Sequence, residues 1–221
     1  MLEQIDSLDR TATLWVNGSQ NLLWDHAILV ATSTWIWVPL GLVLLWLLWR
    51  DVPRRQFWLA VGLLVLGIFV ADNLSASVFK PIFKRWRLTQ DPVYMYAVDV
   101  VRNYRGGRYG FFSAHAANTF TVATFLALLI RHRGLSLLMM SWALLNCYTR
   151  LYLGVHYVGD ILVGTICGLL VGWGCYRLFC RLAHRQSEDK GVLQAESCRI
   201  FSMSIVASYV GVVIVALLYW T

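Results

Sequence analysis

The sequence predicts an all-α protein, a polytopic membrane helical bundle with six spanning helices and an N-terminal interfacial amphipathic helix, in one domain over residues 1–221. Hydrophobic residues make up 58% of the chain and the mean hydropathy is +0.59, values too apolar for a soluble domain. Several uncharged runs approach the length of about 20 residues that a spanning helix needs. The formal charge of +7 comes mostly from short loops between those runs. This pattern is typical of membrane orientation, so we expect a lipid bilayer rather than nucleic acid as the partner.

The N-terminal segment, residues 1–22, mixes apolar residues with Asp6, Asp9 and Arg10. That mixture favours an amphipathic helix on the membrane surface over a spanning helix. The first residues are acidic, whereas a signal peptide begins with a basic region, so we expect no cleaved targeting segment.

Six apolar runs follow and are expected to span the membrane. They cover residues 27–49, 56–79, 113–130, 135–148, 157–178 and 200–220. Asp72 lies near the far end of the second run, where an ionisable residue should face protein rather than lipid. It is expected to pair either with a cation of the active site or within a buried structural pair.

The loops between the runs predict the orientation. Loops 50–55, 131–134 and 181–199 share one side, and because they are basic the positive-inside rule makes that side cytoplasmic. Loop 80–112 and the turn 149–157 then lie outside, with both termini. Loop 80–112 holds seven basic residues against that rule, which suggests that they are kept for chemistry with an anion.

The turn at Arg150 to Asp160 carries the most informative polar residues. His156 and Asp160 are four residues apart, so on a helix they would lie on one face, about 5–6 Å apart, and the carboxylate could orient the imidazole. Arg150 offers a planar donor fork that suits a phosphate. Taken alone, this pattern is equally compatible with a hydrogen-bonded pair that has only a structural role.

Two further stretches fall on the same expected side of the membrane. Lys80 and Arg87 follow the second run, and Phe112-Ser113-Ala114-His115 opens the third. With Arg150, His156 and Asp160, they resemble the three signature motifs of the phosphatidic-acid-phosphatase type 2 superfamily. The resemblance covers residues 80–160. The chain departs from the usual motifs at four positions, where proline, proline, glycine and serine are expected: Leu88, Phe112, Ala114 and Thr149.

The resemblance implies a role for each of these residues. His156 is the nucleophile that forms a phosphohistidine, Asp160 orients it, and His115 protonates the leaving oxygen. The phosphoryl oxygens are bound by side chains and by backbone N–H groups at the start of the third run, without metal or cofactor. The residues expected to bind phosphate are Lys80, Arg87, Arg150, Ser113 and Ala114.

The remaining basic residues of loop 80–112 are expected to be solvated or lipid-facing. The alternative is contact with a second phosphate or a sugar. They are Lys84, Arg85, Arg102, Arg105 and Arg108.

The resemblance implies a metal-independent membrane phosphatase of the bacterial cytoplasmic membrane, with its site facing the periplasm. Undecaprenyl diphosphate is the first expected substrate and lipid A phosphate the second, followed by phosphatidylglycerophosphate or phosphatidate. A different class of function also stays open, a lipid-binding membrane protein without turnover. The intact histidines and Asp160 favour the enzyme.

Overall fold

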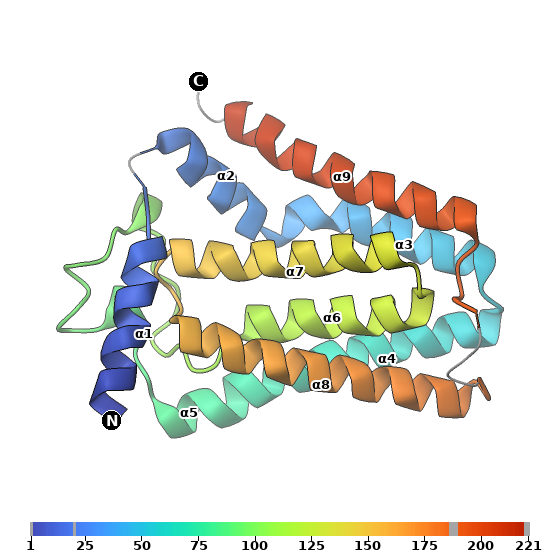
Figure 1. Ribbon diagram of the computed structural model, residues 1–221, viewed down its shortest axis with the longest axis horizontal. Coiled ribbons are helices and arrows are strands. Elements are labelled where there is room, and N and C mark those ends of the chain that lie inside the picture. Colours follow the sequence, from blue (N-terminus) through green and yellow to red (C-terminus); the bar gives the residue numbers. More distant parts are fainter. Residues whose placement is uncertain (1, 20, 186–189, 219–221) are drawn as a thin grey trace.

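The computed structural model describes residues 2–19, 21–185 and 190–218, and Figure 1 shows them as an all-helical bundle. Within these residues no β-strand occurs, and the only pairing of that kind is an isolated bridge between Trp86 and Tyr109. The prediction of an all-α fold is therefore confirmed. The α-helices are α1 (Leu2–Val16), α2 (Leu22–Thr32), α3 (Val38–Asp51), α4 (Arg54–Asn73), α5 (Lys80–Phe83), α6 (Ala114–Ile130), α7 (Arg133–Tyr152), α8 (Val158–Leu182) and α9 (Ala195–Leu218).

Long helices run along the molecule and the connections collect at its two ends. In Figure 1, α4, α6, α7 and α8 follow the long axis, and α1 crosses one end. Loop 84–112 and the α7–α8 turn lie at that same end, whereas the α3–α4 and α6–α7 connections lie at the other. The loops thus divide into the two sets that the sequence predicts. The main apolar core fills the space between α3, α4, α6, α7 and α9.

Within the described residues, three helices are long and apolar enough to cross a membrane. They are the continuous segment Arg54–Phe83, α8 and α9. A fourth candidate is the pair formed by α2 and residues Thr34–Asp51, which is bent by 67°. Helix α6 is apolar but shorter.

The expected span over residues 27–49 is not one continuous helix, because the helix breaks at Ser33. Ser33 has extended backbone (φ −73°, ψ 129°) and is followed by the 3₁₀ turn η1 (Thr34–Trp37). Thr32, Ser33 and Thr34 are weak helix formers in sequence, and Pro39 in the first turn of α3 suits the start of a new helix. The break turns the start of α3 away from α2, and it borders both pockets described below.

Helices α6 and α8 approach each other closely because α8 carries a glycine at every fourth residue of its inner face. A methyl group at Gly164, Gly168 or Gly172 would lie 2.6, 2.4 or 2.7 Å from a backbone carbonyl oxygen of the α6 segment. Only small residues permit such contact between membrane helices. The Ser113 N–H also donates to the Asp160 carbonyl (3.1 Å). The first turns of α6 and α8 are therefore held together.

Helix α4 reaches the same end through a π-helical turn, η2 (Leu74–Phe79), which leads into α5 at Lys80. The Ser75 hydroxyl on this turn is buried and donates to the Phe112 carbonyl (2.7 Å). That bond ties the segment before Lys80 to the segment before α6. π-Helical turns in α-helices frequently mark functional sites.

Helix α1 contacts the bundle through Asp9 and Thr13, while three of its large apolar side chains are exposed. Ile5, Leu8 and Trp15 are 57%, 70% and 88% exposed. Thr13 instead accepts the Val158 N–H (3.2 Å) and Asp9 accepts the Gly159 N–H (2.8 Å), so α1 caps the N-terminus of α8.

Candidate active site

The structure brings the sequence-predicted site residues to one end of the bundle, where α5, α6 and α8 begin and α7 ends (Figure 1). Close packing of α6 on α8 aligns the second and third motifs, and the η2 turn delivers the first. Their positions are Lys80 at the start of α5, Arg87 in the following loop, Ser113 as N-cap of α6, Ala114 and His115 in its first turn, Arg150 in the last turn of α7, His156 in the α7–α8 turn and Asp160 in the first turn of α8.

His156 and Asp160 form a buried hydrogen-bonded pair. His156 Nδ1 lies 3.3 Å from Asp160 Oδ2, and the two side chains are 1% and 0% exposed. The Tyr157 N–H also donates to Asp160 Oδ2 (3.1 Å), which fixes the carboxylate as part of a helix cap. Because an ionised carboxylate only accepts, Nδ1 carries the proton and Nε2 keeps its lone pair.

The electrostatics of His156 suit a nucleophile. Burial lowers its pKa to about 4, the bond to Asp160 opposes this shift, and the positive charges of Arg87 and Lys80 add to it. The imidazole is therefore neutral at neutral pH, as attack on phosphorus requires.

Arg85 is a member of this network that the sequence analysis assigned wrongly as solvated or lipid-facing. Its Nη1 donates to Asp160 Oδ1 (3.0 Å), and its Nη2 donates to Asp9 (2.8 Å) and Asp6 (3.1 Å). Burial opposes its charged form, but Asp160 and Asp9 raise the pKa of Arg85 above its usual value. Asp9 lies 76 residues before Arg85, so no local pattern in the sequence announces the pair.

Arg150 is the most buried cation of the site, at 1% exposed. Its Nη1 donates to the Tyr104 hydroxyl (3.1 Å) and its Nε lies 3.4 Å from the Thr149 hydroxyl. Its Nη2 is buried and has no hydrogen-bond partner among the described residues. A buried guanidinium N–H without an acceptor is costly, so this geometry suits an anion at Nη2.

Lys80, Arg87 and His115 line one pocket at this end of the bundle. Arg87 Nε donates to the Tyr109 carbonyl (3.2 Å), and burial followed by the charge of Arg150 lowers the pKa of Arg87. Arg150, His156, Arg87 and Lys80 all interact electrostatically with His115, so these four groups lie around it. Such a concentration of positive charge favours a phosphate dianion, which would in turn favour protonated His115.

A pocket of about 450 Å³, here called the catalytic pocket, opens from this charge cluster into the bundle. Lys80, Arg87 and His115 line it, and His115 is exposed to it. Farther in, its lining comes from α4, α6, α7 and the α2–η1 break, with apolar Trp37, Ile68, Val122 and Trp142 among polar side chains. Asp72 lines the pocket and accepts from Asn118 (3.2 Å), so it faces protein as expected.

Ser113 and Ala114 were predicted to contact phosphate, but the Ser113 side chain is engaged within helix α6 and Ala114 can offer only its backbone. Ser113 is fully buried and its Oγ accepts the Ala116 N–H (3.3 Å), as an N-cap does. Ala114 lines the catalytic pocket at the N-terminus of α6, where backbone N–H groups favour anions.

Two glycines of loop 84–112 come close to the candidate catalytic side chains. A methyl group at Gly110 would lie 2.8 Å from Asp160 Oδ2, and one at Gly106 would lie 2.7 Å from Arg87 Nη1. Gly106 also has a positive φ (+65°), which only glycine adopts readily. The sequence analysis did not single out Gly110, because nothing local shows that its backbone passes beside Asp160.

The other basic residues of the loop lie apart from the cluster. Lys84 is exposed, as expected. Arg105 donates to the Thr89 carbonyl (3.0 Å), and Arg108 stacks on Trp86 at 4.6 Å. Arg102 lines a different pocket, described below.

The family model described as the PAP2 superfamily matches residues 55–183 of this chain. The chain is 31% identical over 211 residues to a lipid A 4'-phosphatase of Porphyromonas gingivalis, which covers 93% of this chain and 89% of that protein. It is 36% identical over 194 residues to a lipid A 4'-phosphatase of Bacteroides thetaiotaomicron, and this match covers 87% of this chain and 86% of that protein. No solved structure matches significantly.

Proposed function

Because this chain belongs to the PAP2 superfamily and is a phosphatase, we propose that it removes a phosphate from lipid A at the outer face of the bacterial cytoplasmic membrane, through a phosphohistidine on His156. The sequence analysis placed undecaprenyl diphosphate first and lipid A second. The names of the two relatives favour the reverse order.

The observation that carries this proposal is the unpartnered, buried Nη2 of Arg150, a cation whose charge acts on His115, as His156 also does. Lys80 and Arg87 add two cations, and in the part of the chain that the structure describes no carboxylate hydrogen-bonds to any of the three. The two carboxylates nearest this space, Asp160 and Asp72, are held by other partners. A tetrahedral phosphate supplies the acceptors that these donors lack.

The proposed reaction has two steps. His156 Nε2 attacks phosphorus, the bond from phosphorus to the sugar oxygen breaks, and His115 gives that oxygen a proton so that it leaves as an alcohol. Water then attacks the phosphohistidine and His115 takes its proton. Inorganic phosphate leaves and Nε2 regains its lone pair. Lys80, Arg87 and Arg150 offset the charge that develops on the phosphoryl oxygens in both steps.

The catalytic pocket supports a lipid rather than a soluble substrate. Its charged end lies where the helices begin, and it continues inward past Trp37, Ile68 and Val122. An acyl chain contributes roughly 0.8 kcal/mol per buried CH₂ before ordering costs. We therefore expect a lipid phosphate to exceed a short soluble ester by orders of magnitude in kcat/KM.

The membrane arrangement is part of the proposal. We propose six spans, with the bent α2–α3 pair as one of them and α6 and α7 completed by their neighbours. The catalytic end, with α1 lying in the outer interface, faces the periplasm. The exposed Ile5, Leu8 and Trp15 of α1, and the contacts of its Asp9 and Thr13 with α8, support this placement. Cysteine labelling in intact cells tests it: position 95 should label from outside and position 51 should not, and the opposite result would place the site in the cytoplasm.

The substrate is tested with the purified full chain and three phosphates: lipid A with both phosphates, undecaprenyl diphosphate and p-nitrophenyl phosphate. Mass spectrometry of the product should show loss of one phosphate from lipid A, absent with His156→Ala and kept with Lys84→Ala, the matched exposed control. Hydrolysis of undecaprenyl diphosphate without loss of phosphate from lipid A would overturn the substrate. Equal efficiency on p-nitrophenyl phosphate would overturn the lipid-fed site.

A further inference from the structure

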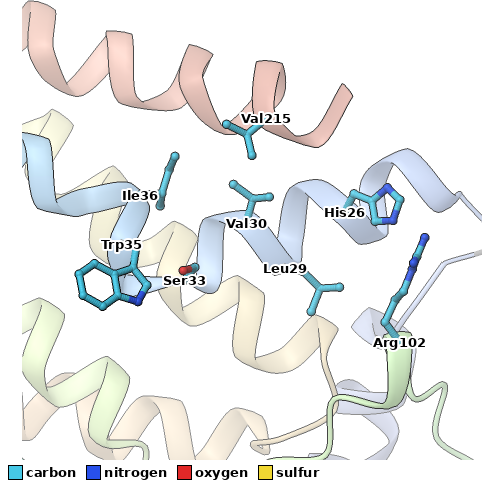
Figure 2. A pocket seen from close by; sticks show the side chains of 8 residues that line it. All are labelled: His26, Leu29, Val30, Ser33, Trp35, Ile36, Arg102 and Val215. Carbon is cyan, nitrogen blue, oxygen red and sulfur yellow. The ribbon is translucent and has the colours of Figure 1, made fainter. Parts of the chain in front are cut away.

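A second pocket, here called the α2 groove, borders the same α2–η1 segment as the catalytic pocket but is lined by different residues. It has a volume of about 550 Å³ and lies between α2, η1, α9 and the turn η4 (Val101–Asn103) (Figure 2). Different residues of the segment 32–37 line the two pockets. Thr32, Thr34 and Trp37 line the catalytic pocket, whereas Ser33, Trp35 and Ile36 line the α2 groove. The groove is therefore a separate site that shares a wall with the catalytic pocket.

One end of the α2 groove carries a buried histidine with an unmet hydrogen bond. His26 lines the groove and is 8% exposed, and its Nδ1 has no partner in the part of the chain that the structure describes. The neighbouring carboxylate on the helix, Asp25, already accepts from the Tyr152 hydroxyl. Buried polar side chains are normally paired, so the state of His26 points to a ligand.

Arg102 lies at the same end. Figure 2 shows its side chain extending toward the His26 ring. Its backbone is left-handed (φ 46°, ψ 41°), a conformation that non-glycine residues adopt at a cost. The hydrogen bonds, ion pairs and ring contacts of the described residues include none from its guanidinium. Arg102 thus offers a free donor fork of the kind that binds phosphate.

Apart from Ser33, the rest of the α2 groove is apolar. Leu29, Val30, Ile36 and Val215 line it, together with Trp35, which is 82% exposed on the outer surface of the bundle. From His26 to Ser33 helix α2 rises roughly 10 Å, at about 1.5 Å per residue. The groove therefore has cationic and hydrogen-bonding groups at the periplasmic end proposed above, and apolar lining toward the middle of the bundle.

We propose that the α2 groove binds an anionic phospholipid, with its phosphate between Arg102 and His26 and an acyl chain along Leu29, Val30, Ile36 and Val215. The charge of the head group complements Arg102, and the volume falls within the range of roughly 300–1,000 Å³ common for small-molecule sites. This lipid is a resident ligand rather than the substrate, because the groove lacks the nucleophile and a phospholipid such as phosphatidylglycerol is a phosphodiester. The proposal does not rest on the phosphatase reaction.

The probe for this site is phosphatidylglycerol with a photoreactive diazirine in its acyl chain, added to the delipidated full chain in neutral detergent. Cross-links should map to Leu29, Val30, Ile36 or Val215. Unlabelled phosphatidylglycerol should compete, whereas diacylglycerol and inorganic phosphate should not. Competition by diacylglycerol to the same extent would reduce the groove to an apolar surface, and competition by inorganic phosphate would make it a free-anion site. Either result overturns the proposal.

Substitutions of Arg102 test whether its guanidinium binds the head group. Arg102→Gln should lower labelling about tenfold, the scale of one charge-assisted hydrogen bond. Arg102→Lys should restore most of it, and Lys84→Gln, which removes an exposed charge from the same end, should leave it unchanged. Unchanged labelling in Arg102→Gln, or an equal loss in Lys84→Gln, would overturn the assignment. If Arg102→Gln does not fold, Val30→Trp, which fills the apolar part, must abolish labelling for the proposal to stand.

Discussion

Replacing Arg85 with alanine should lower turnover without weakening substrate binding to the same degree. Arg85 Nη1 holds Asp160 Oδ1 at 3.0 Å, and Asp160 in turn orients His156. The cations proposed to bind phosphate, Lys80, Arg87 and Arg150, are untouched by the change. The effect should therefore fall on kcat rather than on KM, because Arg85 acts through Asp160 as a positioning residue.

The magnitude follows from the bond that is lost. A charge-assisted hydrogen bond contributes about 1.5–3 kcal/mol, which corresponds to roughly 10- to 150-fold in rate if it is fully used in the transition state. Asp160 keeps two other donors, the Tyr157 N–H and His156, so the carboxylate is not left unpaired. We expect a loss in kcat within that range, and a partial recovery in Arg85→Lys.

The assay is phosphate release from lipid A, with two matched variants. Lys84→Ala removes the adjacent exposed cation and should stay within about twofold of wild type, the scale of a substitution at an exposed site. Asp9→Asn can still accept the Gly159 N–H but no longer pairs its charge with Arg85, so it should lose less than Arg85→Ala. An Arg85→Ala enzyme within threefold of wild type, or an equal loss in Lys84→Ala, would refute the reasoning.

Three further outcomes are expected. Gly110→Ala should lower kcat roughly a hundredfold, because its methyl group would lie 2.8 Å from Asp160 Oδ2 and displace the carboxylate. Gly107→Ala should be nearly neutral, because a methyl group there would have nothing within 4 Å, and similar losses in the two variants would contradict this prediction. Burial lowers the pKa of His156 to about 4, so kcat/KM should hold on the acid side until the pH falls toward that value; a decline centred near the ordinary value of about 6.5 would show a different controlling group. Vanadate should inhibit by occupying the cation cluster and EDTA should not; inhibition by EDTA would require a metal in the reaction.

Much of the candidate site could be predicted from the spacing of residues within short segments of the sequence. The four-residue spacing of His156 and Asp160 survives because both lie at the start of one helix, where spacing determines the shared face. The grouping of the three motifs at one end follows from the alternation of apolar runs and loops, which the structure keeps (Figure 1).

What the sequence did not show depends on contacts between distant segments. Arg85 was expected to be solvated because its partners, Asp9 and Asp160, are 76 and 75 residues away. The break at Ser33 was not predicted because the apolar run continues through it. Hydropathy depends only on residue types, so it does not show where the backbone bends. That break is also what separates the two pockets.

The most direct test of the account is to trap the phosphoenzyme. The full chain is mixed with lipid A carrying radiolabelled phosphate and quenched in alkali, where phosphohistidine survives. It is then cleaved with trypsin, which places His156 on peptide 151–177 and His115 on peptide 109–131. The label should appear on peptide 151–177 and be absent in His156→Ala. Label on peptide 109–131, or phosphate release by His156→Ala at the wild-type rate, would contradict the account.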